Sequence, residues 1–167
     1  RFDAAWRAGT FVYASGKPTE MRPALNWVDA GGKTQELLPA GESVFTPRLS
    51  PDGRKLAASV GSLIVGELFV WDLQRGSRSQ LTSDGQRSSY AVWTSDGKHL
   101  VYVAASPTRS VMWWIRADGG GQPVRLYETT QDMRTSAITP DGRRVVFAQT
   151  GPGTAWDLWT LPLDLSD

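Results

Sequence analysis

The chain contains 167 residues, of which 40% are apolar and 21% charged, and its formal net charge is +1. This composition is typical of a globular domain, and the absence of a basic stripe argues against nucleic acid as a partner. No apolar run approaches the roughly 20 residues that span a bilayer. The absence of cysteine excludes disulfides and thiolate metal sites.

Each of four successive repeats is predicted to begin with a short strand, strand a, at residues 2–6, 44–50, 89–94 and 133–139. In three repeats an Asp-Gly turn follows, at residues 50–54, 94–98 and 139–143. In such turns the Asp accepts nearby backbone N–H bonds and the Gly adopts the positive φ that closes the turn. Apolar runs on both sides of each turn predict a β-hairpin.

The second strand of each repeat, strand b, is almost continuously apolar, which is typical of a strand covered on both faces. These strands are expected at residues 11–13, 56–58, 100–102 and 145–147. Strand c is expected at residues 25–28, 68–71, 112–115 and 158–161, and a short polar strand d at residues 34–38, 77–82 and 122–127. A polar outer strand protects a sheet edge against pairing with foreign strands.

Three markers recur at a period of 44 or 45 residues. They are Trp27, Trp71, Ile115 and Trp159 in strand c, Gly9, Gly53, Gly97 and Gly142 in the turn, and Leu37, Leu81 and Leu126 in strand d. This period, made of short strands and tight turns, predicts an all-β fold, a β-propeller with one four-stranded antiparallel blade per repeat. The blades of this single unit are expected at residues 1–42, 43–86, 87–131 and 132–167.

The fourth repeat ends before its expected strand d, so the sequence predicts three full blades and an incomplete fourth. An open arc of blades would leave apolar faces bare at both ends, which favours self-association. A closed ring of four blades, a pairing of two chains, and a longer propeller of which this is a piece would each cover those faces. We favour the longer propeller, because the chain begins with Arg1 and ends within a blade.

The turns at residues 50–54 (Ser-Pro-Asp-Gly-Arg) and 139–143 (Thr-Pro-Asp-Gly-Arg), each followed by an apolar strand, resemble the repeat of TolB-like propellers. Leu-Thr at residues 81–82 resembles the end of a blade in that family. The WD40 repeat is similar in length, and Trp-Asp at residues 71–72 and 156–157 is similar to its signature pair. Its usual Gly-His pair is absent, so the TolB-like pattern fits the chain better.

Within the TolB-like family the chain is most similar to propellers fused to bacterial Ser/Thr protein kinases. The similarity lies in residues 9–13 (Gly-Thr-Phe-Val-Tyr) and 25–32 (Leu-Asn-Trp-Val-Asp-Ala-Gly-Gly). This resemblance implies a propeller of six or more blades and a binding or sensing role without catalysis. It also favours an extracytoplasmic or periplasmic location.

No pattern of residues points to catalysis. There is no Gly-x-Ser-x-Gly elbow, and the single histidine, His99, is expected to be a partly exposed strand residue. Gly-Gly-Lys-Thr at residues 31–34 lacks the first glycine of a phosphate-binding loop and is expected to form a hairpin turn. Asp52, Asp96 and Asp141 lie in separate turns, so they are not expected to converge on a metal ion. We therefore expect no catalytic residue, no cofactor and no metal site.

Three tryptophans could form exposed aromatic surface. Trp113 and Trp114 are adjacent in a strand and must face opposite ways, so both are expected to pack in the core. Trp156 follows a Gly-Pro-Gly-Thr segment and breaks the repeat, and it is expected to be an exposed aromatic residue.

The resemblance places a binding surface on the face that carries the b–c and d–a loops, because loops on a rigid scaffold carry function. From those loops and their borders we select five candidate binding residues: Arg22, Arg87, Arg109, Asp132 and Trp156. The function expected is a non-catalytic protein-interaction or sensing module. A substrate-filtering propeller of a prolyl-oligopeptidase or tricorn-like peptidase is one alternative, and a binder of small ligands or glycans is another.

Overall fold

The computed structural model describes residues 2–5, 10–15, 24–38, 41–62 and 64–163. Every regular element in this part of the chain is a β-strand, which confirms the all-β fold. It follows that the described residues include no helix that could cross a membrane.

The strands follow the predicted pattern closely. They are β1 (Phe2–Ala5), β2 (Thr10–Ser15), β3 (Ala24–Val28), β4 (Thr34–Leu38), β5 (Val44–Leu49), β6 (Lys55–Gly61), β7 (Gly66–Asp72), β8 (Ser77–Gln80), β9 (Arg87–Trp93), β10 (His99–Ala105), β11 (Ser110–Arg116), β12 (Val124–Thr129), β13 (Met133–Ile138), β14 (Arg144–Gly151) and β15 (Thr154–Pro162).

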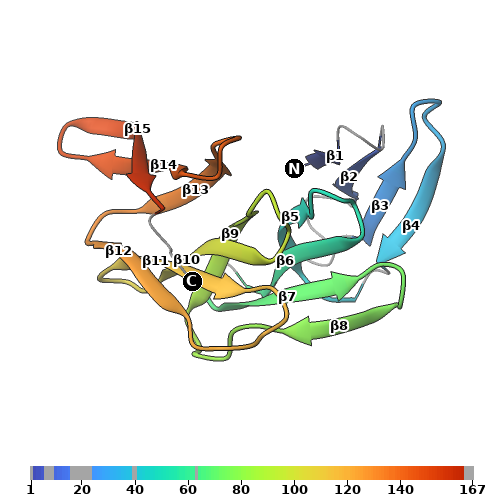
Figure 1. Cartoon of the computed structure of the whole chain (residues 1–167), viewed down its shortest axis with the longest axis horizontal. Coiled ribbons are helices and arrows are strands. Elements are labelled where there is room, and N and C mark those ends of the chain that lie inside the picture. Colours follow the sequence, from blue (N-terminus) through green and yellow to red (C-terminus); the bar gives the residue numbers. More distant parts are fainter. Residues whose placement is uncertain (1, 6–9, 16–23, 39–40, 63, 164–167) are drawn as a thin grey trace.

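Consecutive strands pair antiparallel in four meanders. The first to fourth meanders are β1–β4, β5–β8, β9–β12 and β13–β15, and the described part of the fourth contains three strands. A short parallel bridge between Gly66 of β7 and Arg87 of β9 joins the second and third meanders into one eight-stranded sheet. Figure 1 shows the meanders following one another around an arc, with β1–β4 at one end and β13–β15 at the other.

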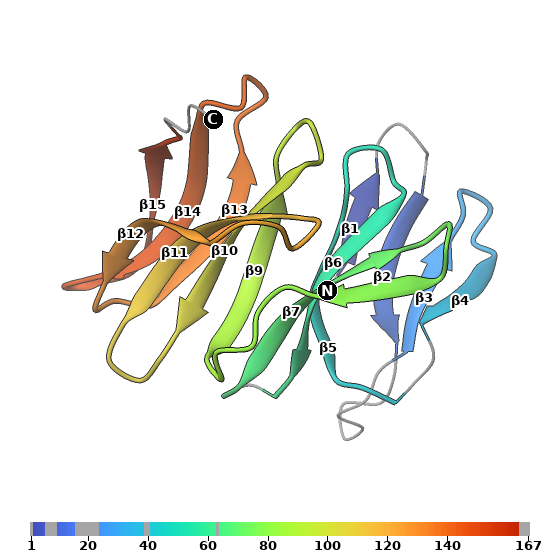
Figure 2. The ribbon, with the colours of Figure 1, turned by 60° about the horizontal axis from the view of Figure 1, so that its bottom comes forward.

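The first strands of successive meanders lie side by side. β1 contacts β5, β5 contacts β9, and β9 contacts β13. The other strands of each meander extend outward from this inner row, so the meanders spread as a fan (Figure 2). Inner strands around a common axis with sheets radiating from it are the arrangement of a β-propeller.

Apolar side chains fill the spaces between neighbouring meanders. One core cluster lies between the first and second meanders, around Leu25 and Trp71. A second lies between the second and third, around Leu68 and Leu100, and a third between the third and fourth, around Met112. The middle meanders are therefore covered on both faces, which explains why their second strands are continuously apolar.

The predicted Asp-Gly turns form as expected. The glycines Gly53, Gly97 and Gly142 have φ angles of 70°, 67° and 72°. A hydroxyl two residues before each aspartate donates to its carboxylate, as between Thr94 Oγ1 and Asp96 Oδ1 at 2.5 Å. These hydrogen bonds close the turn, and they also hold the pKa of the aspartates below its usual range.

The prediction that Trp159 continues the strand c series is wrong. The preceding members, Trp71 and Ile115, pair with the residue three positions after the turn glycine, as in the pair Leu100–Ile115. In the fourth meander that position is Val145, and its partner is Leu161. Trp159 pairs with Phe147 instead, two residues farther along β14.

A β-bulge in β15 accounts for one of the two residues in this change of register. Gln149 pairs with Asp157 and Gly151 pairs with Thr154, so β15 advances three residues while β14 advances two. The extra residue lies in the segment 155–156, and the described second and third strands of the other meanders pair without such an extra residue. Leu161 stands 46 residues after Ile115: the bulge adds one of the two residues beyond the 44-residue spacing, and the other lies before Gly142, which stands 45 residues after Gly97.

His99 is buried, with 9% of its surface exposed, so the prediction of a partly exposed residue is wrong. Its ring stacks on Trp114, with the ring centroids 4.4 Å apart. Trp113 and Trp114 do face opposite cores, as expected. Trp113 packs between the second and third meanders, and Trp114 packs between the third and fourth.

Candidate functional site

Three polar residues occupy the same position in successive meanders, at the start of the inner strand. They are Ser43, Arg87 and Asp132, spaced by 44 and 45 residues. Each lies opposite the end of the second strand of its own meander, in the pairs Ser43–Gly61, Arg87–Ala105 and Asp132–Thr150. The repeat therefore brings Arg87 and Asp132 to the same end of the molecule, which we call the loop face.

A pocket of about 280 Å³ opens on the loop face. It is lined by Ile64, Arg87, Ala105, Ser106, Pro107 and Asp132. The b–c loops of the second and third meanders and both neighbouring d–a connections thus contribute to it. A guanidinium and a carboxylate line a small space that also contains apolar side chains, and such a mixture suits an amphipathic ligand.

Hydrogen bonds of Ser62 close the turn that carries Ile64. The Ser62 hydroxyl accepts the backbone N–H bonds of Ile64 and Val65, and the Ser62 N–H donates to the Val65 carbonyl at 2.6 Å. At both ends of the hairpin a glycine leaves no room for a Cβ atom. A Cβ on Gly61 would lie 2.4 Å from the Val65 carbonyl oxygen, and one on Gly66 would lie 2.8 Å from a serine hydroxyl. The hairpin holds Ile64 80% exposed beside the pocket.

The connection before Arg87 is held by Glu67. The Thr82 hydroxyl donates to Glu67 Oε2 at 2.5 Å, and the Gly85 N–H donates to Glu67 Oε1 at 3.0 Å.

Burial, together with the nearby carboxylates of Asp84 and Glu67, raises the pKa of the Tyr102 hydroxyl well above its usual range. Tyr102 is therefore a neutral core residue at neutral pH, and it supplies no acid or base to the loop face.

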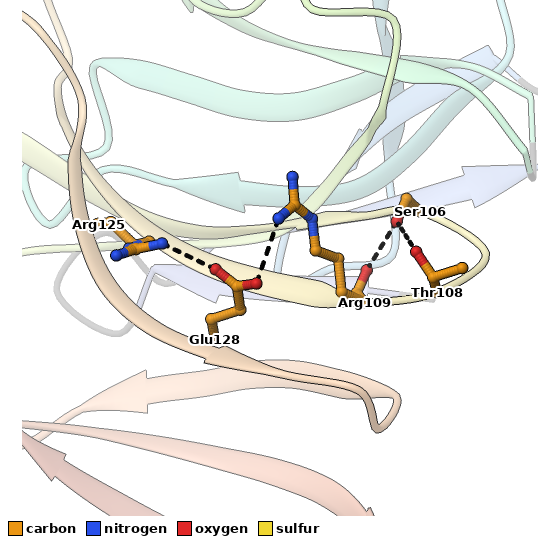
Figure 3. Close-up of polar contacts among 5 residues, drawn as sticks. All are labelled: Ser106, Thr108, Arg109, Arg125 and Glu128. Carbon is orange, nitrogen blue, oxygen red and sulfur yellow. Dashed lines mark hydrogen bonds and ion pairs between the residues drawn. The ribbon is translucent and has the colours of Figure 1, made fainter.

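Arg109 lies in the same loop as Ser106 and Pro107, yet it does not line the pocket. Its Nη1 atom lies 3.2 Å from Glu128 Oε1, and Arg125 Nη1 lies 2.9 Å from the other oxygen of the same carboxylate. Figure 3 shows Glu128 between the two guanidinium groups. The Ser106 N–H and hydroxyl both donate to the Arg109 carbonyl, which closes the loop. Arg109 is thus engaged at the edge of its own meander.

Trp156 is 39% exposed and lies at the β15 bulge, as its break with the repeat suggested. The guanidinium carbon of Arg134 lies 4.2 Å from the centroid of the Trp156 ring. The same carbon lies 5.4 Å from the centroid of the Tyr90 ring. Both distances are within the range of cation–π contacts. Arg22, the fifth predicted residue, lies outside the described residues.

Ile64, Tyr90 and Arg134 are not among the binding residues predicted from the sequence. Ile64 has a signal in the sequence, because it is an apolar residue between two glycines of a predicted loop. Aligning the repeats would also have separated Arg87 and Asp132 from Arg109, since only the first two occupy equivalent positions. Nothing in the sequence places Arg134 beside Trp156, because that contact depends on the bulge.

A metal centre is not among the features of the site. In the segments that the structure describes, no group of three or more histidine, aspartate or glutamate side chains could hold a metal ion. The turn aspartates lie in separate turns, each closed by its own hydrogen bonds.

No known protein-family profile matches the chain. The Tol-Pal system protein TolB of Xanthomonas oryzae pv. oryzae (strain PXO99A) is 33% identical over 81 residues, which make up 48% of this chain and 18% of that protein. The crystal structure of TolB from Acinetobacter baumannii superposes with a TM-score of 0.79 and 19% identity, over 94% of this chain and 40% of that one. The fold is a TolB-like β-propeller.

The TolB-like fold extends to a larger enzyme as well. A prolyl endopeptidase structure superposes with a TM-score of 0.70 and 18% identity, over 95% of this chain and 27% of that one. This chain thus spans less than half of the length of each of these proteins. At these identities the solved structures establish the fold of the chain.

Proposed function

We propose that the chain is a non-catalytic protein-interaction module of a TolB-like propeller, which binds a partner protein through its loop face. The pocket between Arg87 and Asp132 is the observation that carries this proposal. It combines charges of both signs with apolar walls, as is typical of the polar and apolar mixture at protein interfaces. The similarity to a Tol-Pal system protein favours a protein partner.

The exposed side chain of Ile64 supports the proposal. An apolar side chain that is 80% exposed gains most when a partner covers it, and full burial of such a side chain contributes about 1.5–3 kcal/mol. The Ser62 hydroxyl already accepts the N–H groups of Ile64 and Val65, so the backbone on either side of the Ile64 side chain is hydrogen-bonded before a partner binds. Ile64 is therefore suited to be an anchor of the interface.

Peptide display on the whole chain tests this function. Peptides selected on the wild type are expected to bind Ile64→Asp and Asp132→Lys at least tenfold more weakly, because each change alters the pocket lining. Val124→Asp is the matched control, since Val124 is also exposed but lies on the outer strand β12. Equal binding to all three variants, or no selected peptide, would contradict the proposal.

A second candidate is a substrate-filtering propeller of a peptidase, which the similarity to a prolyl endopeptidase favours. In that case the same loop face would admit peptides to a catalytic domain elsewhere in the protein. The present sequence has no Gly-x-Ser-x-Gly segment of its own. Labelling of the natural protein with a fluorophosphonate probe decides between the candidates: a labelled serine supports the filter, and an unlabelled protein rules it out.

A further inference from the structure

We propose that the guanidinium of Arg134, stacked between Trp156 and Tyr90, binds a carboxylate of the partner protein. This inference rests on the proposed function, because it names the chemistry that the partner brings to the loop face. The three residues come from three strands of two meanders: Arg134 from β13, Trp156 from β15 and Tyr90 from β9.

Another stacked arginine in the same chain shows what a complete site of this kind looks like. The guanidinium carbon of Arg78 lies 4.9 Å from the centroid of the Phe69 ring. A carboxylate then caps the guanidinium, since both oxygens of Glu42 accept hydrogen bonds from Arg78, one of them at 3.2 Å. The ring holds the guanidinium in place, and the carboxylate accepts its N–H groups in a bidentate pair.

Arg134 has the stacking but not the carboxylate. Its guanidinium contacts two rings rather than one, and its side chain is exposed. Within the described ranges, no hydrogen bond or ion pair is recorded for the Arg134 side chain. Three other exposed arginines have polar side-chain partners: Arg116 pairs with Asp118, Arg109 with Glu128, and Arg144 donates to Thr160. The N–H donors of Arg134 therefore remain available to a ligand.

The two rings are held in place by unusual backbone. Among the described pairings of a second with a third strand, only that of β14 with β15 contains a bulge, and this bulge sets the position of Trp156. Tyr90 lies in a bulge of β9 with a φ angle of 57°, and Thr46, 44 residues earlier, has a φ angle of 49°, so this inner-strand bulge belongs to the repeat and sets where the Tyr90 side chain lies. The hydroxyl of Thr135, the neighbour of Arg134, donates to the Tyr90 carbonyl and ties the two strands together.

The surroundings favour a single carboxylate over a phosphate. Asp132 is exposed and stands two residues before Arg134, roughly 7 Å along an extended strand. Its negative charge disfavours a dianion more strongly than a monoanion at the same place. The Asp132 pocket and Arg134 thus suit adjacent parts of one ligand, with the carboxylate at Arg134.

A titration followed by NMR tests this site without a known partner. The whole chain is titrated with N-acetylglutamate α-amide, which offers a side-chain carboxylate, and with N-acetylglutamine, which offers a terminal one. N-acetylglutamine α-amide is the neutral control. We expect saturable shifts of the Arg134 Nε–H and Trp156 indole N–H signals, with a dissociation constant on the order of 1–10 mM.

The response to the two acids tells which carboxylate the site prefers, and either response supports the proposal. The Arg78 Nη–H signals are an internal control and should not respond, because the Nη1 and Nη2 groups of Arg78 already donate to Glu42. Absence of a saturable shift at Arg134 with both acids, or an equal shift with the neutral amide, overturns the proposal.

Variants complete the test. Arg134→Gln should abolish the Trp156 response to the acids, whereas Arg143→Gln, a change at an exposed arginine in a turn, should retain it. Peptides selected by display should bind Arg134→Gln at least tenfold more weakly and should contain an acidic residue. If they bind through Ile64 and Asp132 but do not depend on Arg134, the carboxylate site is wrong while the proposed function stands.

Discussion

Gly61 has no space for a side chain. Its φ angle is 145°, and an added Cβ atom would lie 2.4 Å from the Val65 carbonyl oxygen and 2.8 Å from the Gly66 Cα atom. We expect Gly61→Ala to lower the free energy of unfolding by at least about 2 kcal/mol, because strain and a clash with backbone atoms add together. Chemical denaturation measures this loss.

Gly76 is the matched control for Gly61. It also has a positive φ, of 66°, but no atom lies within 4 Å of its added Cβ atom. Gly76→Ala should therefore cost only about 1 kcal/mol, from the backbone conformation alone. Equal losses for the two variants would contradict the predicted clash of a Cβ atom at Gly61 with the Val65 carbonyl.

The turn aspartates should make stability depend on pH. The Thr94 hydroxyl donates to Asp96 and lowers the pKa of this carboxyl in the folded state. A group with a lowered folded pKa stabilises the fold fully above its unfolded pKa of about 3.9, and this contribution is lost as the pH falls toward the folded pKa. Urea denaturation between pH 5 and pH 3 should therefore show decreasing stability.

Two substitutions in one turn check the cause of that pH dependence. Asp96→Asn removes the titrating group, and Thr94→Val removes the hydrogen bond that perturbs it, so both should show a smaller loss of stability on acidification than the wild type. A wild-type slope in Asp96→Asn would show that other groups are responsible.

At the scale of elements, the inner strands are joined by hydrogen bonds from one meander to the next. The Thr135 hydroxyl of β13 donates to the Tyr90 carbonyl of β9, and Thr135 is buried. Thr135→Val keeps the shape but leaves that carbonyl without its donor, so we expect a loss of about 1–3 kcal/mol in chemical denaturation. Thr108→Val, at an exposed loop hydroxyl, should change stability by no more than about 0.5 kcal/mol.

The repeat pattern was enough to predict the strands and turns. The Asp-Gly turns and apolar runs depend on local chemistry, so β4 was placed at its observed bounds. The register of β15 could not be predicted, because a bulge depends on how two strands pair and not on their composition. Trp159 keeps the 44-residue spacing although its structural counterpart is Trp113, which pairs with Tyr102 as Trp159 pairs with Phe147.

The candidate site was predictable in part. Arg87 and Asp132 share a repeat position, so an alignment of the repeats is sufficient to bring them together at the loop face. Arg109 lies in one of the predicted binding loops, but its guanidinium forms an ion pair with Glu128 on the adjacent strand β12. The sequence could not show this pairing, because a long side chain can reach several possible partners, and which of them is close depends on the folded structure.

At the scale of the whole molecule, the fourth meander has an uncovered face built like the covered ones. Met112 pairs with Val103 and is 0% exposed, whereas Leu158 pairs with Ala148 at the equivalent position and is 78% exposed. We therefore expect Met112→Ala to cost about 2–5 kcal/mol. Leu158→Ala should change the stability of the isolated chain by no more than about 0.5 kcal/mol.

The exposed Leu158 face also predicts association of the isolated chain, since large apolar patches mark a missing partner surface. Light scattering coupled to small-angle X-ray scattering should detect species larger than a monomer. Leu158→Asp should shift the distribution toward the monomer. A wild-type chain that is monomeric and melts cooperatively would contradict this expectation and would favour a closed ring of four blades.

The bridge between Gly66 and Arg87 makes β5–β12 one continuous backbone-bonded body, whereas the two end meanders belong to separate sheets. Partial opening of the chain should therefore begin with β1–β4 or β13–β15, and β5–β12 should be the last part to lose its protected amides. The pocket lies where these two sheets meet, because Arg87 belongs to the sheet β5–β12 and Asp132 directly precedes β13 of the end sheet. A ligand that contacts both Arg87 and Asp132 would link the sheet β13–β15 to the sheet β5–β12. Binding should therefore slow amide exchange in β13–β15, including at residues that do not touch the ligand.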